Sequence, residues 1–462
     1  MSNVGFQMPD RKTPYIFPAS PEDWLPPDHL ARFVVEVVEN LDLSSIVNSY
    51  NARGKQAYHP RLLLTLLFYG YATGVFSSRK IERATYDSVA FRYISGDMHP
   101  DHDTISTFRK RFLRELRALF IQILQIASEM GFLNVGTVSL DGTKVKANAS
   151  KHTALSWEYA NKLEERLKNE VSELLRKGEE SDNELVLDGL DIPEELSRRE
   201  DRLAAIAKAK EEIARRVKNR YEKEQSEYAK KMSAREEKSR LSGKKPRGKE
   251  PIPPKDNGPC KVDQVNLTDS DSRIMHVSGG GFEQCYNAQA GVDVESMLII
   301  THNVTQNPND KRELDPFLES VDTLPEELGK VTTILADAGY CSEENVKSVV
   351  DHGIDPYICV SREPHNQRLS ERFSYEEPIV SQDAFLQMKN RLKTLEGRML
   401  YAKRKCTVEP VFGLIKAVMG FRQFLLRSIE SVKGEWNLVC IAWNLKRLHS
   451  LRRKTIGAEQ QG

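Results

Sequence analysis

The chain has 462 residues, of which 39% are hydrophobic and 29% charged, and its formal net charge is +1 at pH 7. This length allows two or three domains with a sizeable buried core, so a globular enzyme of several parts is the first expectation. The longest apolar run, 62–76, is shorter than the roughly 18 to 20 residues that span a bilayer. We interpret it as a buried helix, which argues against a membrane protein.

Charges are segregated along the chain. Between residues 389 and 454, sixteen Lys and Arg stand against four Glu, a net of +12, whereas 179–201 is mainly acidic. A basic segment of this kind suits phosphate groups, although a solvated basic helix surface would look the same.

Neither the start of the chain nor its cysteines indicate an exported or zinc-binding protein. Residues 1–15 show no apolar segment behind a basic start, so we expect no export signal. We interpret the six cysteines as reduced and structural, because none forms a C-x-x-C pair or has a His partner at zinc spacing. They are Cys260, Cys285, Cys341, Cys359, Cys406 and Cys440.

Residues 23–130 have apolar side chains three and four positions apart, which predicts an all-helical N-terminal part. Within it, 78–87 and 103–117 are predicted as helices on either side of a connector, with Asp103 as the cap of the second helix. This arrangement is compatible with a helix-turn-helix whose second helix contacts DNA, although any short bundle with a basic face looks alike. The expected contacts near the start of that helix are Thr104, Thr107, Arg109, Lys110 and Arg111.

The run VGTVSLDGTKVKA, 135–147, predicts a strand that ends at the turn Asp141-Gly142. Residues 157–243 are rich in Glu, Lys and Arg and carry apolar positions at helical, partly heptad spacing. An acidic loop at 178–193 interrupts them, so we expect an antiparallel helical hairpin inserted into the domain. The Pro-rich basic stretch KKPRGKEPIPPK, 244–255, follows as a linker.

Strand patterns resume after the linker. Segments 264–267, 275–277, 286–292 and 297–304 predict an antiparallel meander, and 314–321 a helix. The run VTTILADAGYCS predicts a buried strand that ends at Asp337, with a helix beginning near Ser342. A strand at 356–360 and two helices follow, the first with Glu409 and Lys416, the second with Trp436. This order implies a mixed α/β core.

Two aspartates occupy the same predicted position, directly after an apolar strand: Asp141 before Gly142 and Asp337 before Ala338-Gly339. If the strands are neighbours, the carboxylates converge, and the glycines leave room for a phosphate backbone. Such oxygen ligands suit Mg²⁺ or Mn²⁺. Glu409 is the best third carboxylate, because it opens a helix that Thr407 could cap and Lys416 lies two turns further on the same face. For either Asp alone, a simple turn signal is the alternative.

Two metals held by three such acids activate an attacking water or 3′-hydroxyl and stabilise the leaving oxygen. No protein nucleophile is then required, which agrees with a chain in which we identify no Ser-His-Asp or Cys-His grouping. Phosphate-compatible groups surround Glu409, although a basic amphipathic helix is the alternative: Tyr401, Arg404, Lys405 and Lys416.

These residues resemble the DDE insertion-sequence transposases, whose catalytic domain is ribonuclease H-like and similar to that of retroviral integrases. The resemblance is to the insertion-sequence group numbered eleven eighty-two, which is related to the IS-four and IS-five transposases. It spans nearly the whole chain, and the three acidic motifs in order are its most specific part. The matching stretches are PDHDTISTFRKRF from Pro100, SLDGTKVKANAS from Ser139, NLTDSDSRIM from Asn266, YNAQAGVD from Tyr286, ADAGYCSEEN from Ala336 and VEPVFGLIKAVMGFRQFLLR from Val408.

In that family the third acid lies in a signature of Tyr, Arg, Glu and Lys, which the resemblance carries over to Tyr401, Arg404, Glu409 and Lys416. Arg404 is one residue further from Glu409 than the usual spacing, and Lys405 takes the expected place. Either of the two is therefore expected to contact the DNA backbone.

For the fold, the resemblance implies an α/β protein: a ribonuclease H-like mixed sheet flanked by helices, with an all-helical N-terminal domain and a coiled-coil-like helical insertion. We expect the DNA-binding helical domain at 1–132, the catalytic domain at 133–155 and 258–455, and the insertion with its linker at 156–257. The insertion is expected to support dimerisation or to clamp the element end, unless it is only a spacer.

For function, the resemblance implies a DNA transposase that binds the ends of its insertion sequence, cleaves the backbone and joins the 3′-hydroxyl ends to target DNA. Asp141, Asp337 and Glu409 would be the catalytic residues and would hold two Mg²⁺ ions, for which Mn²⁺ substitutes. The partners would be double-stranded DNA, as terminal inverted repeats and target, and a second copy of the chain, because two ends must meet. We expect no membrane partner and a place in the prokaryotic cytoplasm, at the nucleoid.

Two alternatives stay open. A ribonuclease H-like nuclease would cut DNA or RNA without strand transfer, and would release a 3′-hydroxyl that is never joined. A decayed or domesticated copy would bind DNA through the N-terminal helices and the basic C-terminal segment; the intact acids argue against decay.

Overall fold

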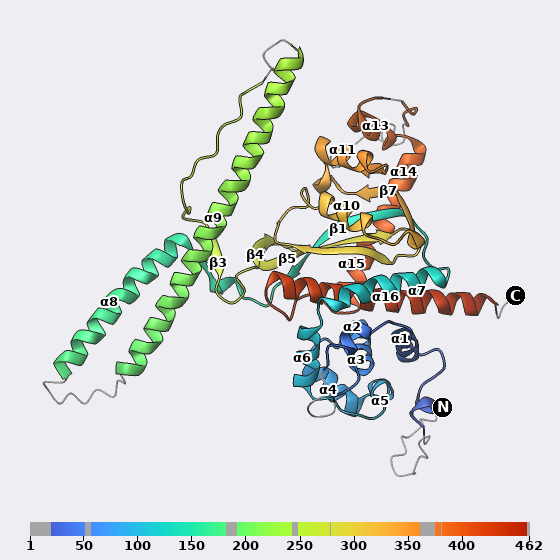
Figure 1. Ribbon diagram of the computed structural model, residues 1–462, viewed down its shortest axis with the longest axis horizontal. Helices are drawn as coiled ribbons and strands as arrows, with labels where there is room; N and C mark the ends of the chain where they lie inside the picture. The colour runs from blue at the N-terminus through green and yellow to red at the C-terminus, as the bar shows by residue number, and fades with distance from the viewer. Residues whose placement is uncertain are drawn as a thin grey trace, which may run out of the picture.

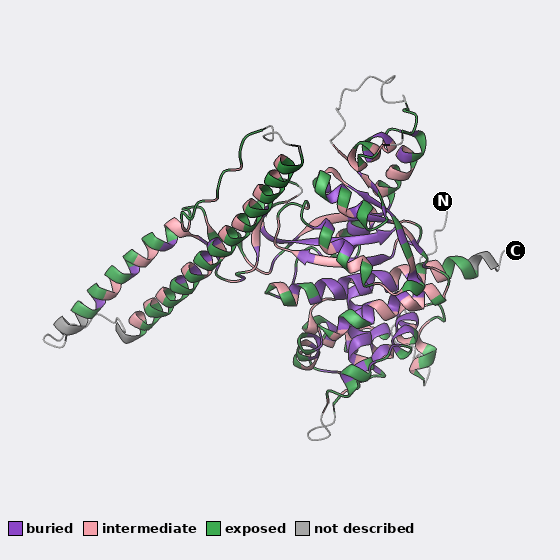
Figure 2. Cartoon of the chain, turned by 45° about the horizontal axis from the view of Figure 1, so that its top comes forward, coloured by how far each residue is buried: buried purple, intermediate pink, exposed green. Residues whose placement is uncertain are grey.

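The computed structural model describes residues 20–50, 57–181, 192–242, 248–277, 279–360, 375–379 and 381–459. Figure 1 shows N-terminal helices below two long helices, a sheet above those two, and a helical hairpin that projects from one side of the sheet. Buried residues gather in the sheet and the N-terminal bundle, whereas the hairpin is mostly exposed (Figure 2). Within the described ranges, no helix is both long and apolar enough to cross a membrane.

The N-terminal part is all helical, as predicted. α3 is almost wholly buried, which confirms the interpretation of the apolar run. Proline suits its first position, because the N–H that proline lacks has no partner in the first turn of a helix. The elements are η1 Pro21–Trp24, α1 Leu30–Glu39, α2 Ser44–Val47, α3 Pro60–Ala72, α4 Ser78–Asp87, α5 Val89–Ser95, α6 His102–Arg111 and α7 Glu115–Glu129.

The predicted helix-turn-helix is wrong in its connectivity. α4 has the predicted bounds, but the connector after it contains a further helix, α5, and the segment 103–117 is divided between α6 and α7. Asp101, not Asp103, caps α6, because its carboxylate accepts a hydrogen bond from the Thr104 backbone N–H at 2.7 Å. α4 and the basic helix α6 do pack together, although α5 lies between them in the chain.

A six-stranded mixed sheet forms the centre of the molecule. Its order is β4-β5-β1-β7-β8, and β6 pairs with β5 beside β4. β1 is antiparallel to β5 and parallel to β7, and β7 is parallel to β8. β2 and β3 form a separate antiparallel pair. The strands are β1 Val135–Lys146, β2 Ala154–Ser156, β3 Gln264–Asn266, β4 Arg273–His276, β5 Phe282–Asp293, β6 Ile299–Thr305, β7 Gly329–Ala336 and β8 Asp355–Ile358.

The structure corrects the end of the first strand. β1 does not stop at the Asp141-Gly142 turn signal but continues to Lys146, and Asp141 pairs with Ala290 of β5. Pairing with β5 overrides the local turn preference of Asp-Gly, because each ladder position adds hydrogen bonds and a packed neighbour. Asp337 follows the end of β7 as predicted. The meander of β4, β5 and β6 is also confirmed, except that β3 pairs with β2 outside it.

Helices cover both faces of the sheet. α7 and α16 lie side by side on one face, and α10 and α11 lie on the other (Figure 1). Trp436 of α16 donates its indole N–H to the Gln289 carbonyl at 3.1 Å, and the Asn444 amide bonds both backbone groups of Ile299. The elements after β6 are α10 Leu314–Asp322, η3 Glu326–Leu328, η4 Ala338–Tyr340, α11 Glu343–Asp351, α13 Ala384–Arg391, α14 Leu395–Ala402, η5 Lys403–Cys406, α15 Val408–Ala417 and α16 Ile429–Glu459.

One hydrophobic core joins the N-terminal helices to the sheet. It runs without a break from α1 and α3 through α16 to β1, β5 and β7. Phe421, for example, lies edge-on to Phe76 at a centroid distance of 5.3 Å and near Tyr71 of α3 at 6.4 Å. The N-terminal helices are therefore joined to the sheet by one continuous core that includes α16.

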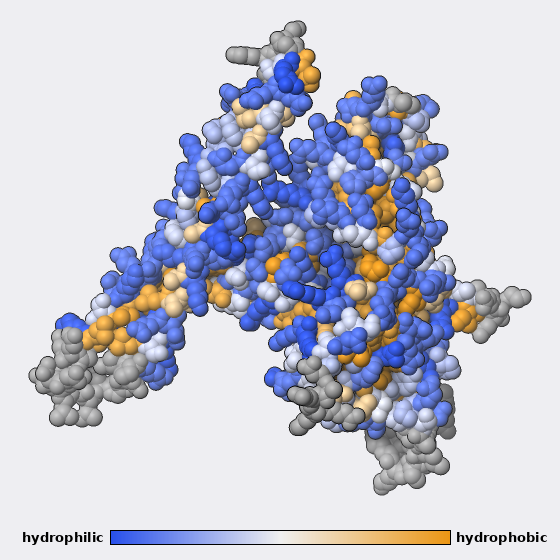
Figure 3. Space-filling view, in the orientation of Figure 1, coloured by the Kyte–Doolittle hydropathy of each residue, from blue (hydrophilic) through white to orange (hydrophobic). Residues whose placement is uncertain are grey.

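The predicted hairpin is formed by α8 Trp157–Ser181 and α9 Ile192–Ser242. The two helices and the β2-β3 pair share a small core that includes Leu167, Ile206, Ile213 and Val265. The surface of the hairpin is otherwise mostly hydrophilic (Figure 3). Residues 182–191 of the predicted acidic loop and 243–247 at the start of the predicted linker lie outside the described residues.

All six cysteines are free thiols, in agreement with their prediction as reduced residues. Cys285 and Cys440 are buried, and burial raises the pKa of both thiols. Cys260 and Cys406 are exposed, so a structural role in the core fits only some of the six.

Candidate active site

Asp141 and Asp337 come together because their strands are parallel neighbours. The last paired residues of the two strands are Leu140 and Ala336, so the next position on each strand carries an aspartate. Adjacent strands are about 4.8 Å apart, which places the two carboxylates on the same face side by side. Asp141 lies within β1 and pairs with Ala290 of β5, whereas Asp337 caps the short helix η4 through the Gly339 N–H at 2.8 Å.

Arg404 links the first acid to the third. Its Nη1 lies 3.1 Å from Asp141 Oδ2 and its Nη2 lies 3.0 Å from Glu409 Oε1. Glu409 lies in the first turn of α15, as predicted, but Thr407 does not cap that helix, because its hydroxyl donates to the Lys403 carbonyl instead. The guanidinium is mostly buried, and its Nε has no hydrogen-bond partner. The buried guanidinium of Arg404 therefore bridges the carboxylates of Asp141 and Glu409.

The site carries an excess of negative charge. Burial raises the pKa of Asp141 to about 6; Arg404 opposes this shift, and the neighbouring carboxylate of Asp337 adds to it. A fourth carboxylate, Asp310, contributes to the same field. Because ionisation of Asp141 is costly at this buried position, its carboxylate favours a nearby cation of higher charge than the single charge of Arg404.

Asp310 is the residue of this cluster that the sequence did not single out. It follows β6 in the stretch Asn307-Pro308-Asn309-Asp310, which has the composition of an ordinary turn. A signal did exist on the neighbouring strand, because Asn287 and Gln289 are polar residues at alternate positions of a buried strand. Both donate to Asp310 Oδ1, at 2.6 and 2.7 Å.

The sequence suggested that Gly142 leaves room for a phosphate backbone, but the structure shows that it does not. A Cβ at this position would lie 2.5 Å from Asp310 Oδ1 and 2.9 Å from Asn287 Oδ1, and it would also meet Gln289. The space beside the strand is therefore filled by this polar cluster, and glycine is required for its close approach.

The other two residues of the Tyr, Arg, Glu and Lys signature, Tyr401 and Lys416, contact the protein interior, whereas the neighbouring Lys405 faces solvent. Tyr401 lies beside Arg404, and burial raises the pKa of its hydroxyl. Lys416 Nζ donates to Thr143 Oγ1 at 2.5 Å and to the Lys144 carbonyl at 2.9 Å, which ties α15 to β1. Lys405 is exposed and forms no ion pair within the described residues. Of the two candidates before Glu409, Arg404 faces the acids and Lys405 faces solvent.

The five residues predicted on the second helix for DNA contact are not equivalent. Arg111 is exposed, but its guanidinium donates to the Ser49 carbonyl at 2.7 Å. Arg109 is buried, and its guanidinium donates to the Tyr71 hydroxyl and the Phe76 carbonyl, both at 3.1 Å. Tyr71 in turn bonds buried Glu435, so the prediction that Arg109 contacts DNA is wrong: its charge balances an interior carboxylate. Thr104 bonds Asp101, and Thr107 and Lys110 are exposed.

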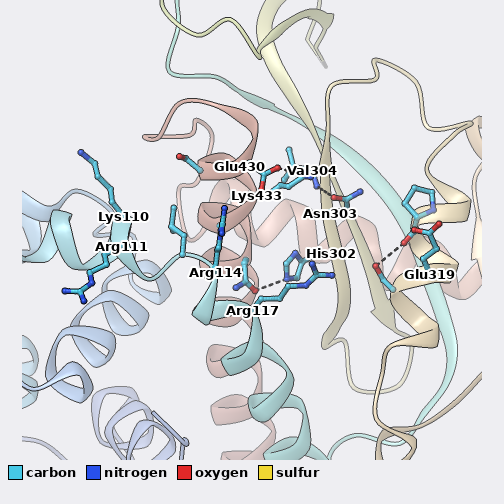
Figure 4. A pocket seen from close by; sticks show the side chains of 16 residues that line it. Lys110, Arg111, Arg114, Arg117, His302, Asn303, Val304, Glu319, Glu430 and Lys433 are labelled. Atoms are coloured by element: carbon cyan, nitrogen blue, oxygen red, sulfur yellow. Dashed lines mark hydrogen bonds and ion pairs between the residues drawn. The ribbon is translucent and has the colours of Figure 1, made fainter. Parts of the chain in front are cut away.

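Lys110 borders a basic hollow of about 660 Å³ between α6, α7, β6 and α16 (Figure 4). Arg114, Arg117 and Lys433 line the same hollow. Within the part of the chain that the structure describes, the side chains of Lys110, Arg114 and Arg117 form no hydrogen bond or ion pair. Three unpaired cations along one side of a hollow form a surface suited to an anion.

The acid cluster fits a divalent cation by its chemistry, because carboxylate oxygens in excess negative charge are the ligands that Mg²⁺ prefers. Among the described residues, however, no three acidic, His or Cys side chains are gathered closely enough to hold a metal ion. Arg404 lies between Asp141 and Glu409 and forms an ion pair with each of them. A metal shared by these two acids requires the guanidinium to leave at least one of them.

Two family models match parts of the chain. Residues 263–445 match the family model described as the transposase DDE domain, and residues 19–111 match a second model, the transposase domain DUF772. Together the two matches cover more than half of the chain. Neither the curated proteins nor the solved structures contain a match.

Both matches support one class of protein, a DNA transposase of the DDE type. Within that class they support a transposase of the insertion-sequence kind. The class implies a DNA substrate, divalent metal ions and, in general terms, metal-dependent nuclease or transposition activity. Asp337 and Glu409 lie inside the matched DDE domain, and Asp141 precedes it.

Proposed function

We propose that this chain binds the ends of its own insertion sequence, cleaves the phosphodiester backbone and joins the 3′-hydroxyl ends to target DNA. The observation that supports this best is the convergence of Asp141 and Asp337 on two parallel strands, with Glu409 linked to Asp141 through Arg404. We further propose that the sheet is ribonuclease H-like. Its strand order supports that assignment, because the central strand β1 is antiparallel to β5 on one side and parallel to β7 on the other.

In this proposal Asp141, Asp337 and Glu409 hold two Mg²⁺ ions, or Mn²⁺ in their place. When bound, the two cations supply activation of the attacking oxygen and stabilisation of the leaving oxygen. The chain itself contributes orientation: pairing with Ala290 of β5 fixes Asp141, and η4 fixes Asp337 through the Gly339 N–H. Arg404, once released from Glu409, reaches a phosphate beside the acids as a charge-assisted donor.

DNA recognition is assigned to two surfaces. The first is the hollow lined by Lys110, Arg114 and Arg117, with Thr107 nearby on α6; the second is the exposed Lys405 next to the acids. Unpaired surface cations release counterions when phosphates bind, so both surfaces would contribute to affinity and to its salt dependence.

The domain division proposed from the sequence is kept: DNA binding at 1–132, catalysis at 133–155 and 258–455, and the insertion at 156–257. We propose a homodimer on DNA, because two element ends must be joined in one reaction, and action at the nucleoid of a prokaryotic cell. Within the insertion-sequence transposases, we propose the group numbered eleven eighty-two.

The test is incubation of the purified protein with labelled DNA carrying its element ends, in Mg²⁺, Mn²⁺ or EDTA. Asp141→Ala, Asp337→Ala and Glu409→Ala should each abolish cleavage and keep specific DNA binding, because most base and phosphate contacts lie elsewhere. Cutting and joining that depend on metal and are lost in all three variants would support the proposal. Cutting without joining would favour a nuclease, and binding without cutting in any metal would favour a DNA-binding relic.

A further inference from the structure

Asp310 lies where the two aspartate strands meet, although it comes from neither strand. A Cβ at Gly339 would lie 2.9 Å from Asp337 Oδ1 and 3.6 Å from Asp310 Oδ2, so the two carboxylates face the same glycine. At Gly142, the residue after Asp141, a Cβ would lie 2.5 Å from Asp310 Oδ1. Two glycines thus bring a third aspartate to the edge that Asp141 and Asp337 share.

The two oxygens of Asp310 have different surroundings. Oδ1 accepts from the side-chain amides of Asn287 and Gln289, and Lys144 Nζ lies 3.7 Å away. Gln289 is itself oriented, because its amide oxygen accepts a hydrogen bond from the buried Tyr340 hydroxyl. Within the described residues no hydrogen bond reaches Oδ2, which is the oxygen on the Asp337 side. One oxygen is anchored by buried amides and the other is free.

This is the arrangement in which proteins hold a metal-binding carboxylate, since outer hydrogen bonds fix the ligand and leave a lone pair directed at the ion. A second, independent observation points the same way. Asn287 is fully buried, and its Oδ1, which lies 2.9 Å from the Cβ position at Gly142, has no hydrogen-bond partner. A buried oxygen without a donor, in the residue that binds Asp310, leaves an acceptor position open to a cation or its bound water.

We propose that Asp310 is a further ligand of the metal centre and contributes Oδ2 to a divalent cation shared with Asp337. This inference rests on the proposed metal-dependent function and adds a residue to it. Asn287 and Gln289 act as positioning residues, because their side-chain amides hold Asp310 Oδ1. The cluster then offers carboxylates from β1, from the ends of β6 and β7, and from α15.

Binding of Mn²⁺ to the full-length protein, measured by electron paramagnetic resonance, tests this without any need for turnover. Asp310→Asn is nearly isosteric: its amide oxygen can still accept from Asn287 and Gln289, while an NH₂ group replaces the free oxygen. We expect its Mn²⁺ affinity to fall by at least about 10- to 100-fold, which is the range for loss of an outer partner of a metal ligand. Asp315→Asn in the neighbouring α10 is the matched control, and its affinity should equal that of the wild type.

Four outcomes decide the matter. Weaker binding in Asp310→Asn, but not in Asp315→Asn, supports the inference. Wild-type affinity in Asp310→Asn, with binding lost in Asp141→Asn and Asp337→Asn, overturns it and keeps the proposed function. Absence of Mn²⁺ binding by the wild-type protein overturns both. If Asp310→Asn does not fold, Fe²⁺-generated hydroxyl radicals on the wild-type protein should cut the backbone near 310 as well as near 141 and 337; no cut near 310 would overturn the inference.

Discussion

Replacing Arg404 by alanine should destabilise the metal-free protein and strengthen its binding of metal. The guanidinium is 12% exposed, Asp141 is 18% exposed and Glu409 is 47% exposed. Removing one partner of a buried pair costs about 3 to 5 kcal/mol, whereas a half-exposed pair contributes less than about 1 kcal/mol. We therefore expect a decrease of about 3 kcal/mol in the free energy of unfolding in EDTA, nearly all of it from Asp141.

Metal should reverse that decrease. Any ligand that binds only the folded protein stabilises it, by about 2.7 kcal/mol at a concentration of 100 times Kd. In Arg404→Ala the cation no longer competes with the guanidinium, so Mn²⁺ should bind more tightly and restore most of the stability. Urea titrations in EDTA and in Mn²⁺ measure both quantities.

Arg452→Ala is the control, because it removes an ion pair of 2.7 Å to Glu36 that is exposed on both sides. This variant should be less stable by under about 1 kcal/mol, and Mn²⁺ should stabilise it as much as the wild type. The reasoning fails if Arg404→Ala is as stable as Arg452→Ala in EDTA, or if Mn²⁺ stabilises both to the same extent.

Three further predictions concern residues away from the acids. Arg109→Ala should lower the free energy of unfolding by about 3 kcal/mol, because it leaves buried Glu435 without its cation, and should leave the salt dependence of DNA binding unchanged. If the variant is as stable as the wild type and its salt slope in an anisotropy titration is shallower, Arg109 contacts DNA after all. Replacing Lys110, Arg114 and Arg117 together by glutamine should reduce the slope of log K against log salt by about 0.9 for each phosphate that is no longer neutralised; an unchanged slope would remove the hollow from the DNA surface. Burial lowers the pKa of His302 from 6.5 to about 4, so the folded state prefers the neutral ring; stability from this residue is complete above pH 6.5 and declines by at most about 1.4 kcal/mol per pH unit as the pH falls toward 4. His302→Gln should lack that part of the decline in urea titrations at several pH values, and an identical pH profile would contradict the assignment.

The features that the sequence predicted well are strands and helix starts determined by residues close together in the chain. The strand before Asp337 and the helix that begins after Ser342 were predicted correctly, because apolar runs and helix caps are set by residues close in the chain. The position of Glu409 at the start of a helix was predicted for the same reason.

What the sequence missed depends on partners far along the chain. Asp141 lies within a strand because β5, about 150 residues later, pairs with it. Arg109 is buried because its carboxylate partner, Glu435, belongs to the C-terminal helix. Asp310 lies in a segment with the composition of a turn, and the residues that hold it beside the acids, Asn287 and Gln289, belong to another strand. Patterns within a window of a few residues carry no information on these contacts.

The position of α16 has a consequence for synthesis on the ribosome. This helix is made long after α1, α3 and α7, yet it packs against all three of them as well as β6. Contacts between residues so far apart cannot form early, because the loop between them must first exist and then close. The N-terminal helices therefore lack part of their core until residues 429–459 have emerged, and a chain that stops before α16 should be degraded or aggregate rather than bind DNA. Chains truncated before α16 should therefore not compete for DNA with chains that contain it.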